Sequence, residues 1–230
     1  MPYITSTKME SQQASPAFSN NWFQTNTKLT QQLMVDQQPK SVLEIGAFEG
    51  QFTCFALANF SQLADYFVID TFQGSGEHTE AQSSGLRQRF DANVASQQVA
   101  IDRIDFQVLT GYSQDLLIRL RSKQQDGFAP DFDLIYVDGS HEGKDVLLDL
   151  VLAYQLCAVG GLIVADDYQW QGHKKTPKLA GTWSPKPAID AFYKLYGTID
   201  ARNQPAFQSN IQLSVELVHK GRQFVVRKLA

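Results

Sequence analysis

The sequence predicts a single α/β domain built on a doubly wound, mostly parallel sheet of seven strands, with an antiparallel hairpin at its C-terminal end. Short apolar runs alternate along most of the chain with longer segments of helical periodicity, which is typical of a parallel sheet covered by helices on both faces. A length of 230 residues suits one such domain. No repeat or linker marks a second one, so residues 17–230 are expected to form one unit.

The composition indicates a chain with its own core and no broad basic surface. Apolar residues make up 43% of the chain and charged residues 19%, which suffices for a core without disulfides or a structural metal. The formal net charge of −4 disfavours general nucleic-acid binding. Only two cysteines occur, and we find neither a secretory leader nor an apolar run of about 18–20 residues. We therefore expect a cytoplasmic protein without a nucleic-acid or membrane partner.

The first half of the chain is expected to contain an arm, three helices and three strands. Residues 1–16 lack apolar periodicity and end at Pro16, which predicts a flexible arm. Helical spacing that stops before Pro39 predicts the first helix, and apolar runs bounded by turn residues predict the strands. The expected elements are a helix over Phe18–Asp36, a strand over Ser41–Ile45, a helix over Gln51–Phe60, a strand over Tyr66–Asp70, a helix over Ala81–Ala95 and a strand over Asp105–Leu109.

The alternation continues in the second half and ends in a hairpin. The turn Lys220-Gly221-Arg222 joins the last two strands, which therefore add to the edge of the sheet in the antiparallel direction. The expected elements are a strand over Phe132–Val137, a helix over Gly143–Ala158, a strand over Leu162–Ala165, a helix over Lys186–Tyr196 and strands over Ile211–His219 and Gln223–Leu229.

Acidic residues end four of the five parallel strands. They are Glu44, Asp70, Asp138 and the pair Asp166 and Asp167. In a doubly wound sheet the ligand binds outside the carboxyl ends of the strands, so these side chains are the first candidates for a site. Each acid alone has a simpler interpretation as a turn residue or a helix cap. Together, however, like charges at one edge repel unless a cation or a hydroxyl-rich ligand joins them.

The turn after the first strand indicates which cofactor to expect. It reads Glu44-Ile45-Gly46-Ala47-Phe48-Glu49-Gly50 and departs from the dinucleotide fingerprint G-x-G-x-x-G. Because Glu44 and Glu49 flank the turn, they are expected to repel a pyrophosphate at the helix N-terminus. A cofactor with an amino group, a sulfonium and no phosphate, such as S-adenosylmethionine, fits better. Asp70 is placed to accept hydrogen bonds from ribose hydroxyls, as it also would be in a nicotinamide enzyme.

These features together resemble the class I S-adenosylmethionine-dependent methyltransferases, which have a Rossmann-like fold. The stretch Gly111–Leu117 is similar to the G-x-S-Q-D stretch of catechol O-methyltransferases, in which the Ser and Gln lie against the adenine. Asp138-Gly139-Ser140-His141, Gly160-Gly161 and Asp166-Asp167-Tyr168 resemble a broad bacterial family that methylates hydroxyls of sugars and natural products. The resemblance covers about residues 41–170.

The resemblance implies a set of cofactor-binding residues and a metal site. The cofactor residues it implies are Glu44, Gly46, Ala47, Phe48, Gly50, Asp70, Thr71, Ser113, Gln114 and Asp138. In catechol-type relatives an Asp and an Asp-Asn pair bind Mg²⁺, and Asp138, Asp166 and Asp167 occupy those positions, with Asp167 in place of the Asn. Mg²⁺ or Mn²⁺ there would orient the substrate oxygens and lower the pKa of the reacting hydroxyl. The alternative is that these acids only cap turns.

His141 occupies the position of a catalytic Lys in the catechol-type pattern. An imidazole has an ordinary pKa of about 6.5, so His141 can serve as a general base beside Asp138 in catalysis. It can equally pack on the cofactor or hydrogen-bond the loop. His78 follows the second strand, and Trp170, His173, Lys174, Lys175 and Lys178 follow the fifth. His78 can face a substrate, and the second group can form a lid that attracts an anionic or sugar substrate, but we interpret all of them as exposed loop residues. Both cysteines are expected in the core, within helices.

The function expected from these observations is methyl transfer from S-adenosylmethionine to a hydroxyl of a small metabolite, assisted by a divalent metal. The acceptor would be a sugar, a natural product or a catechol-like compound. Two alternatives remain: a nicotinamide-dependent oxidoreductase on the same fold, and a non-catalytic S-adenosylmethionine-binding protein. A homo-oligomer is compatible with the sequence. Residues 1–40 and 168–210 contain no pattern that identifies the substrate.

Overall fold

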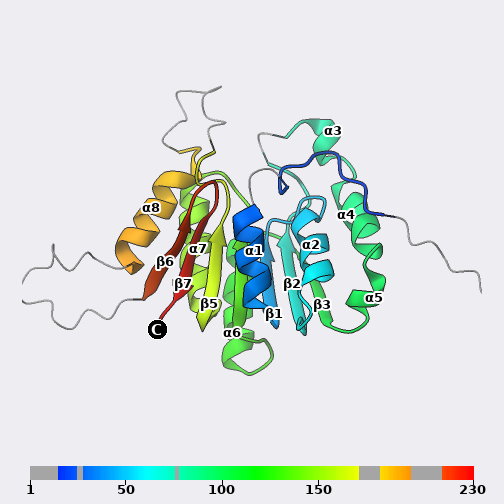
Figure 1. Cartoon of the computed structure of the whole chain (residues 1–230). Helices are drawn as coiled ribbons and strands as arrows, with labels where there is room; N and C mark the ends of the chain where they lie inside the picture. Colours follow the sequence, from blue (N-terminus) through cyan, green and yellow to red (C-terminus); the bar gives the residue numbers. More distant parts are fainter. Residues whose placement is uncertain (1–14, 25–27, 76–77, 171–181, 198–213) are drawn as a thin grey trace, which may run out of the picture.

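The computed structural model describes residues 15–24, 28–75, 78–170, 182–197 and 214–230, and these form a seven-stranded sheet between two layers of helices (Figure 1). The strand order is β3-β2-β1-β4-β5-β7-β6. The strands are β1 (Ser41–Ile45), β2 (Asp65–Asp70), β3 (Asp105–Thr110), β4 (Phe132–Val137), β5 (Cys157–Ala165), β6 (Val215–Lys220) and β7 (Phe224–Lys228). The first five are parallel, and β7 pairs antiparallel with β5 and β6. The predicted fold class is confirmed.

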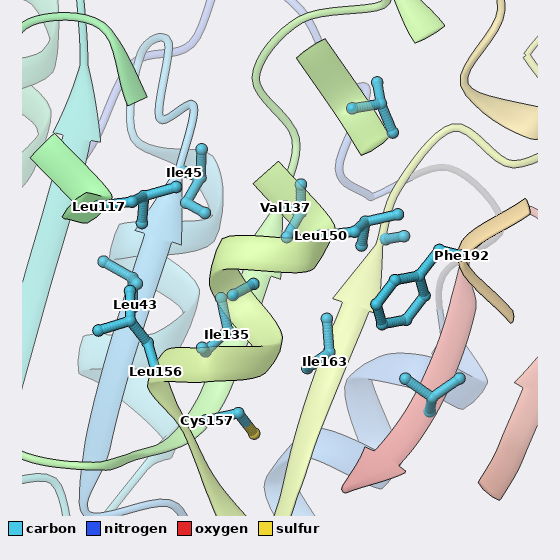
Figure 2. Packing of buried hydrophobic residues seen from close by; sticks show 14 of the residues in the cluster. Leu43, Ile45, Leu117, Ile135, Val137, Leu150, Leu156, Cys157, Ile163 and Phe192 are labelled. Atoms are coloured by element: carbon cyan, nitrogen blue, oxygen red, sulfur yellow. The ribbon is translucent and has the colours of Figure 1, made fainter. Parts of the chain in front are cut away.

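The inner strands β1, β2, β4 and β5 bury side chains on both faces of the sheet, which is why they read as nearly continuous apolar runs. In β1, Leu43 and Ile45 belong to one core cluster and Val42 to the other. The helices are α1 (Lys28–Gln37), α2 (Gln51–Asn59), α3 (Glu80–Ser83), α4 (Leu86–Ala95), α5 (Gln98–Ile101), α6 (Ser113–Gln125), α7 (Gly143–Leu156) and α8 (Pro185–Tyr196). Helices α6, α7 and α8 cover the first cluster, part of which Figure 2 shows, and α1, α2 and α4 cover the second.

The prediction of a helix from Phe18 is wrong in its first part. Residues 22–24 form a turn and α1 begins at Lys28. The Asn20 side chain accepts a hydrogen bond from the N–H of Trp22, and this side-chain bond competes with the helical pattern. The N–H groups of Ala17 and Ser19 are likewise bonded to the side chains of Asn93 and Glu49. The segment is thus held in an extended path against α2 and α4.

Other helix limits differ from the prediction for identifiable reasons. The helix expected over residues 81–95 is divided into α3 and α4 at Gly85, which has a φ of 65° that ends the first piece. The helix expected to reach Ala158 ends at Leu156, and Cys157 begins β5. Helix α6 was not predicted, because only Leu117 and Leu120 of its thirteen residues are buried. Residues 211–213 of the expected sixth strand lie outside the described residues.

The strand order reverses between β1 and β4, and this places the first turn against the end of β4. β1 pairs with β2 on one side and with β4 on the other. Gly46 has a φ of 85°, and a Cβ there would lie 2.1 Å from the backbone oxygen of Asp138. Only glycine permits this approach. The two loops that follow β1 and β4 therefore meet at the position where ligands bind in such sheets. Among the described residues, no helix has the length and apolar character needed to cross a membrane.

Candidate functional site

A cavity of about 690 Å³ opens at the carboxyl ends of β1, β4 and β5. Its size is within the range of small-molecule sites. One side of its lining is mainly aromatic, and the other carries acids and basic groups. The lining residues are Trp22, Phe23, Glu44, Gly46, Ala47, Phe48, Glu49, Gln51, Phe52, His78, Gln82, Asp138, Gly139, His141, Asp166, Asp167, Trp170, Trp183 and Arg222. Segments from both ends of the chain thus contribute to one site.

The two glutamates of the first turn are engaged within the protein. Glu44 accepts hydrogen bonds of 2.6 Å from the hydroxyls of Thr53 and Tyr66, and burial raises its pKa to about 8. Glu49 forms an ion pair of 2.6 Å with Arg89. The raised pKa of Glu44 and the pairing of Glu49 with Arg89 weaken the expected repulsion of a pyrophosphate by these acids.

Asp70 holds the first turn in place. Its Oδ2 accepts hydrogen bonds from the N–H groups of Ala47 (2.7 Å) and Phe48 (2.9 Å), and its Oδ1 accepts one from Phe72 (2.6 Å). These bonds stabilise Phe48, whose φ of 50° is unfavourable for a residue with a Cβ. Asp70 is outside the cavity lining. A ribose contact remains a prediction, and the structure adds a role in shaping the turn that lines the cavity.

Three residues expected to bind the cofactor are outside the cavity lining: Ser113 and Gln114, which were expected at the adenine, and Thr71. Gln114 donates a 3.0 Å hydrogen bond to Asp145, and Ser113 donates one to Asp149. Thr71 accepts a hydrogen bond from the N–H of Gln73. These three positions lie at the ends of β2 and the start of α6. Their part in cofactor binding remains a prediction.

Asp149 is a buried carboxyl that the sequence analysis did not identify. It lies in α7 with 1% of its surface exposed, and its Oδ1 has no hydrogen-bond partner among the described residues. Burial raises its pKa to about 7. The sequence alone does not show that Asp149 is buried, because an acid among apolar residues of a helix can also reach solvent.

We expect Asp149→Asn to stabilise the protein increasingly as the pH rises from 5 to 8. Because the pKa of Asp149 is raised on folding, the native state binds more protons than the unfolded state between about pH 4 and 7, so its stability falls as the pH rises through that range. The substitution removes a penalty of up to about 4 kcal/mol at pH 8. Melting temperatures at several pH values, with Asp126→Asn as an exposed control, test this. A pH-independent difference from the wild type would contradict it.

The polar side of the cavity brings Asp138, His141 and Asp167 together. One potential ligand atom of each lies within 4.8 Å of the others, and the Nε2 of His141 is 2.7 Å from the Oδ2 of Asp167. Asp166 is engaged differently: its Oδ2 accepts hydrogen bonds from Tyr136 and Gln223, and its Oδ1 accepts one from the N–H of Asp167. Of the three acids expected to bind a metal, the structure therefore groups two with His141.

The electrostatics of this acid group favour a cation. Burial, with the nearby carboxylates of Asp166 and Asp167, raises the pKa of Asp138 well above its usual range. Burial and Asp167 also raise the pKa of Asp166. A divalent cation between these groups would relieve the repulsion, and carboxylate oxygens are ligands that Mg²⁺ and Mn²⁺ prefer. The residues present therefore fit such an ion.

Several cavity residues were missed or misplaced by the sequence analysis. His78 and Trp170, expected to be exposed, line the cavity: the Trp170 ring lies 4.4 Å from that of His141, and the His78 ring 5.8 Å from that of Trp22. Arg222, in the last hairpin, reaches within 4.0 Å of the Oδ1 of Asp167. No local pattern marks Trp22 or Arg222, because only the tertiary fold brings their segments to the site. His173, Lys174, Lys175 and Lys178 lie outside the described residues.

Both cysteines are buried and unbridged, as predicted. Burial raises the pKa of the Cys54 and Cys157 thiols to about 12. Thiols that remain protonated at pH 7 are poor nucleophiles. The two residues are therefore core residues, although Cys157 lies at the start of β5 and not within a helix.

Known proteins resemble this chain in sequence and in fold. A family model described as a methyltransferase domain matches residues 43–168. A search of curated proteins found no match. Similar solved structures include an O-methyltransferase from Bacillus cereus in complex with SAH, with 18% identity, coverage of 94% of this chain and 84% of that chain, and a TM-score of 0.55. The O-methyltransferase TomG from Streptomyces achromogenes, involved in tomaymycin synthesis and in complex with SAM, has 17% identity, coverage of 94% and 82%, and a TM-score of 0.58.

A third similar structure contains a metal. It is the MycE methyltransferase of the mycinamycin biosynthetic pathway, in complex with Mg, SAH and mycinamycin VI. The identity is 16%, the TM-score is 0.53, and the match covers 93% of this chain and 50% of that chain. At these identities, the structural similarities show a shared fold.

Proposed function

Because the chain belongs to the methyltransferase domain family that its residues 43–168 match, we propose that it transfers a methyl group from S-adenosylmethionine to a hydroxyl of a small metabolite. The main observation behind the proposal is that Asp138, His141 and Asp167 lie together in the lining of a cavity, at the position where the strand order reverses. O-Methyltransferases in complex with SAH or SAM share the fold and support this choice of cofactor. The acceptor is a sugar, a natural product or a catechol-like molecule.

The cofactor is expected to bind along the first turn. Gly46, Ala47 and Phe48 line the cavity, and Asp70 keeps their backbone in place. The methyl group would then face the acid group at the end of β4. The aromatic lining, which includes Trp22 and Phe48 with ring centroids 5.3 Å apart, would exclude water from the reacting atoms.

The acceptor hydroxyl is activated in two ways in this proposal. A bound Mg²⁺ or Mn²⁺, held by Asp138 and Asp167, would orient the acceptor oxygens and lower the pKa of the hydroxyl. His141 accepts the hydroxyl proton, and the carboxylate of Asp167 stabilises the imidazolium that results. Trp170, packed on the His141 ring, limits its rotation. These contacts support a proton acceptor and a metal site within one cavity.

The two alternative functions are less well supported. A nicotinamide-dependent oxidoreductase is disfavoured by the methyltransferase family match and by the missing glycine pattern. A non-catalytic S-adenosylmethionine-binding protein would have no need of the half-buried pair of His141 and Asp167, and a methyl-transfer assay distinguishes it. The buried free thiols support the cytoplasmic location expected from the sequence.

We expect calorimetry to show binding of S-adenosylhomocysteine without added metal, and Asp70→Ala to weaken it about 10- to 150-fold. The variant removes charge-assisted hydrogen bonds, worth roughly 1.5–3 kcal/mol, that either contact the ribose or hold the turn that contacts the cofactor. Asp102→Ala, which changes an exposed carboxyl at the end of α5, is the control. Unchanged affinity in Asp70→Ala, or a preference of the wild type for NADH, would contradict the proposed cofactor.

A further inference from the structure

The antiparallel register of β5 and β7 places the last hairpin beside the acid pair that follows β5. Ala165 of β5 pairs with Phe224 of β7. Asp166, which follows Ala165, and Gln223, which precedes Phe224, are therefore also neighbours. Figure 1 shows this hairpin, β6 and β7, at the edge of the sheet next to β5. An element that follows Asp166 by nearly sixty residues in the chain therefore borders the proposed metal site.

Gln223 is the centre of a buried hydrogen-bond network that holds Asp166. Its Nε2 donates to the Oδ2 of Asp166 (2.9 Å) and to the hydroxyl of Tyr136 (2.8 Å), and its Oε1 accepts from the hydroxyl of Thr30. The Tyr136 hydroxyl donates to the same Oδ2 of Asp166. Gln223 and Tyr136 are each 1% exposed and Thr30 is 2% exposed. All of these donors and acceptors are satisfied by one another.

The other oxygen of Asp166 is engaged as well. Its Oδ1 accepts a 2.7 Å hydrogen bond from the N–H of Asp167, the residue that follows it. Asp167 has a φ of 56°, a conformation that a residue with a Cβ adopts only when its surroundings hold it there. In that conformation its Oδ2 lies 2.7 Å from the Nε2 of His141. The side chain of Asp166 thus sets the direction of the Asp167 carboxylate.

We propose that Asp166 is a positioning residue and not a metal ligand, that Gln223 holds it in that role, and that Asp138 and Asp167 are the carboxylate ligands of the divalent cation. The inference rests on the metal site of the proposed function. If Asp166 turned toward a cation, the buried Tyr136 hydroxyl and Gln223 amide would each lose their acceptor. The last hairpin is therefore part of the active site, because it determines which acids of the cluster remain available.

A charge exchange between positions 166 and 223 tests this role. In the double variant Asp166→Asn with Gln223→Glu, the carboxylate moves to position 223 and the amide to position 166. The new carboxylate can accept from Thr30, from Tyr136 and from the new amide, and the new amide oxygen can still accept from the N–H of Asp167. The hydrogen bonds from Thr30 and from the N–H of Asp167 keep their direction, and the three that join residues 136, 166 and 223 are preserved with donor and acceptor reversed. A carboxylate ligand at position 166, in contrast, is lost.

The measurement is the affinity of the full chain for Mn²⁺ alone, obtained by electron paramagnetic resonance titration with S-adenosylhomocysteine present. We expect Asp166→Asn and Gln223→Glu each to weaken Mn²⁺ binding about 10- to 100-fold, the usual effect of changing an outer partner of a metal ligand. The double variant is expected to bind Mn²⁺ within about threefold of the wild type, with the same spectrum of the bound ion. Asp167→Asn with Gln223→Glu is the matched control, and it is expected to stay at the low affinity of Asp167→Asn.

Two results would overturn the inference, and they differ in what else they contradict. If the double variant binds Mn²⁺ as weakly as Asp166→Asn, then Asp166 is a ligand, and the proposed function is unaffected. If the wild type binds no Mn²⁺, the metal part of the proposed function fails together with the inference. Melting temperatures identify variants that do not fold. If a variant does not fold, Tyr136→Phe is measured in its place, because it keeps the ring stacked on Phe52. Tyr136→Phe is expected to weaken Mn²⁺ binding, and an unchanged affinity would contradict the inference.

Discussion

Replacing His141 with alanine is expected to lower kcat by about 10²- to 10⁴-fold, the usual contribution of a general base, while the affinity for S-adenosylhomocysteine stays nearly unchanged. The Nε2 of His141 is 2.7 Å from the carboxylate of Asp167, its ring packs against Trp170, and the residue lines the cavity. The imidazole is therefore held beside the proposed metal, where the hydroxyl of an acceptor would lie. His219→Ala, a histidine of β6 outside the cavity lining, is the control.

The pH profile distinguishes the role of His141 from that of the metal. A general base acts in its neutral form, so kcat/KM is expected to fall as the pH drops through the pKa of that base. This acidic limb should disappear in His141→Ala. If His141 is instead a metal ligand, the variant should lose affinity for Mn²⁺ and regain activity when Mn²⁺ is raised. A variant with near-normal kcat and the same acidic limb would leave His141 with a structural role only.

Removing the metal is expected to abolish methyl transfer. Treatment with EDTA should reduce the rate to background, and Mg²⁺ or Mn²⁺ should restore it, because the cation both orients the acceptor and lowers the pKa of its hydroxyl. Asp167→Asn should lower the rate by more than about 100-fold, since loss of a ligand exceeds the usual effect of changing an outer partner.

Binding of S-adenosylhomocysteine to the EDTA-treated protein serves as the control for this prediction. Because the hydrogen bonds from Ala47 and Phe48 to Asp70 hold the first turn without involving the acid cluster, that binding should persist without metal. Full activity of a chelated, metal-free preparation would contradict the metal site. It would limit Asp138 and Asp167 to contacts with the loops and the cofactor.

Local patterns in the sequence predicted the elements that depend on short-range physics. β1, β2, β4 and β5 were predicted because strands buried on both faces require apolar runs such as Ser41–Ile45, whatever packs on them. Gly46 and Gly50 marked the first turn because both have positive φ values. Limits that depend on tertiary partners were predicted less well. The segment before α1 has helical spacing, yet its backbone bonds to the side chains of Asn93 and Glu49 keep it extended.

The sequence by itself determined the fold class and the edge of the sheet at which the acids gather. What each acid does was decided only by the tertiary structure. Burial raises the pKa of Glu44, whose carboxyl accepts from Tyr66 of the neighbouring strand, Asp70 is used by the backbone of the first turn, and Asp166 is held by Gln223 of the last hairpin. The physical reason is that internal hydrogen-bond donors compete with a ligand for a carboxylate, and those donors come from distant parts of the chain. Asp138 and Asp167 remain directed at the cavity with His141 because the fold brings them within reach of one another.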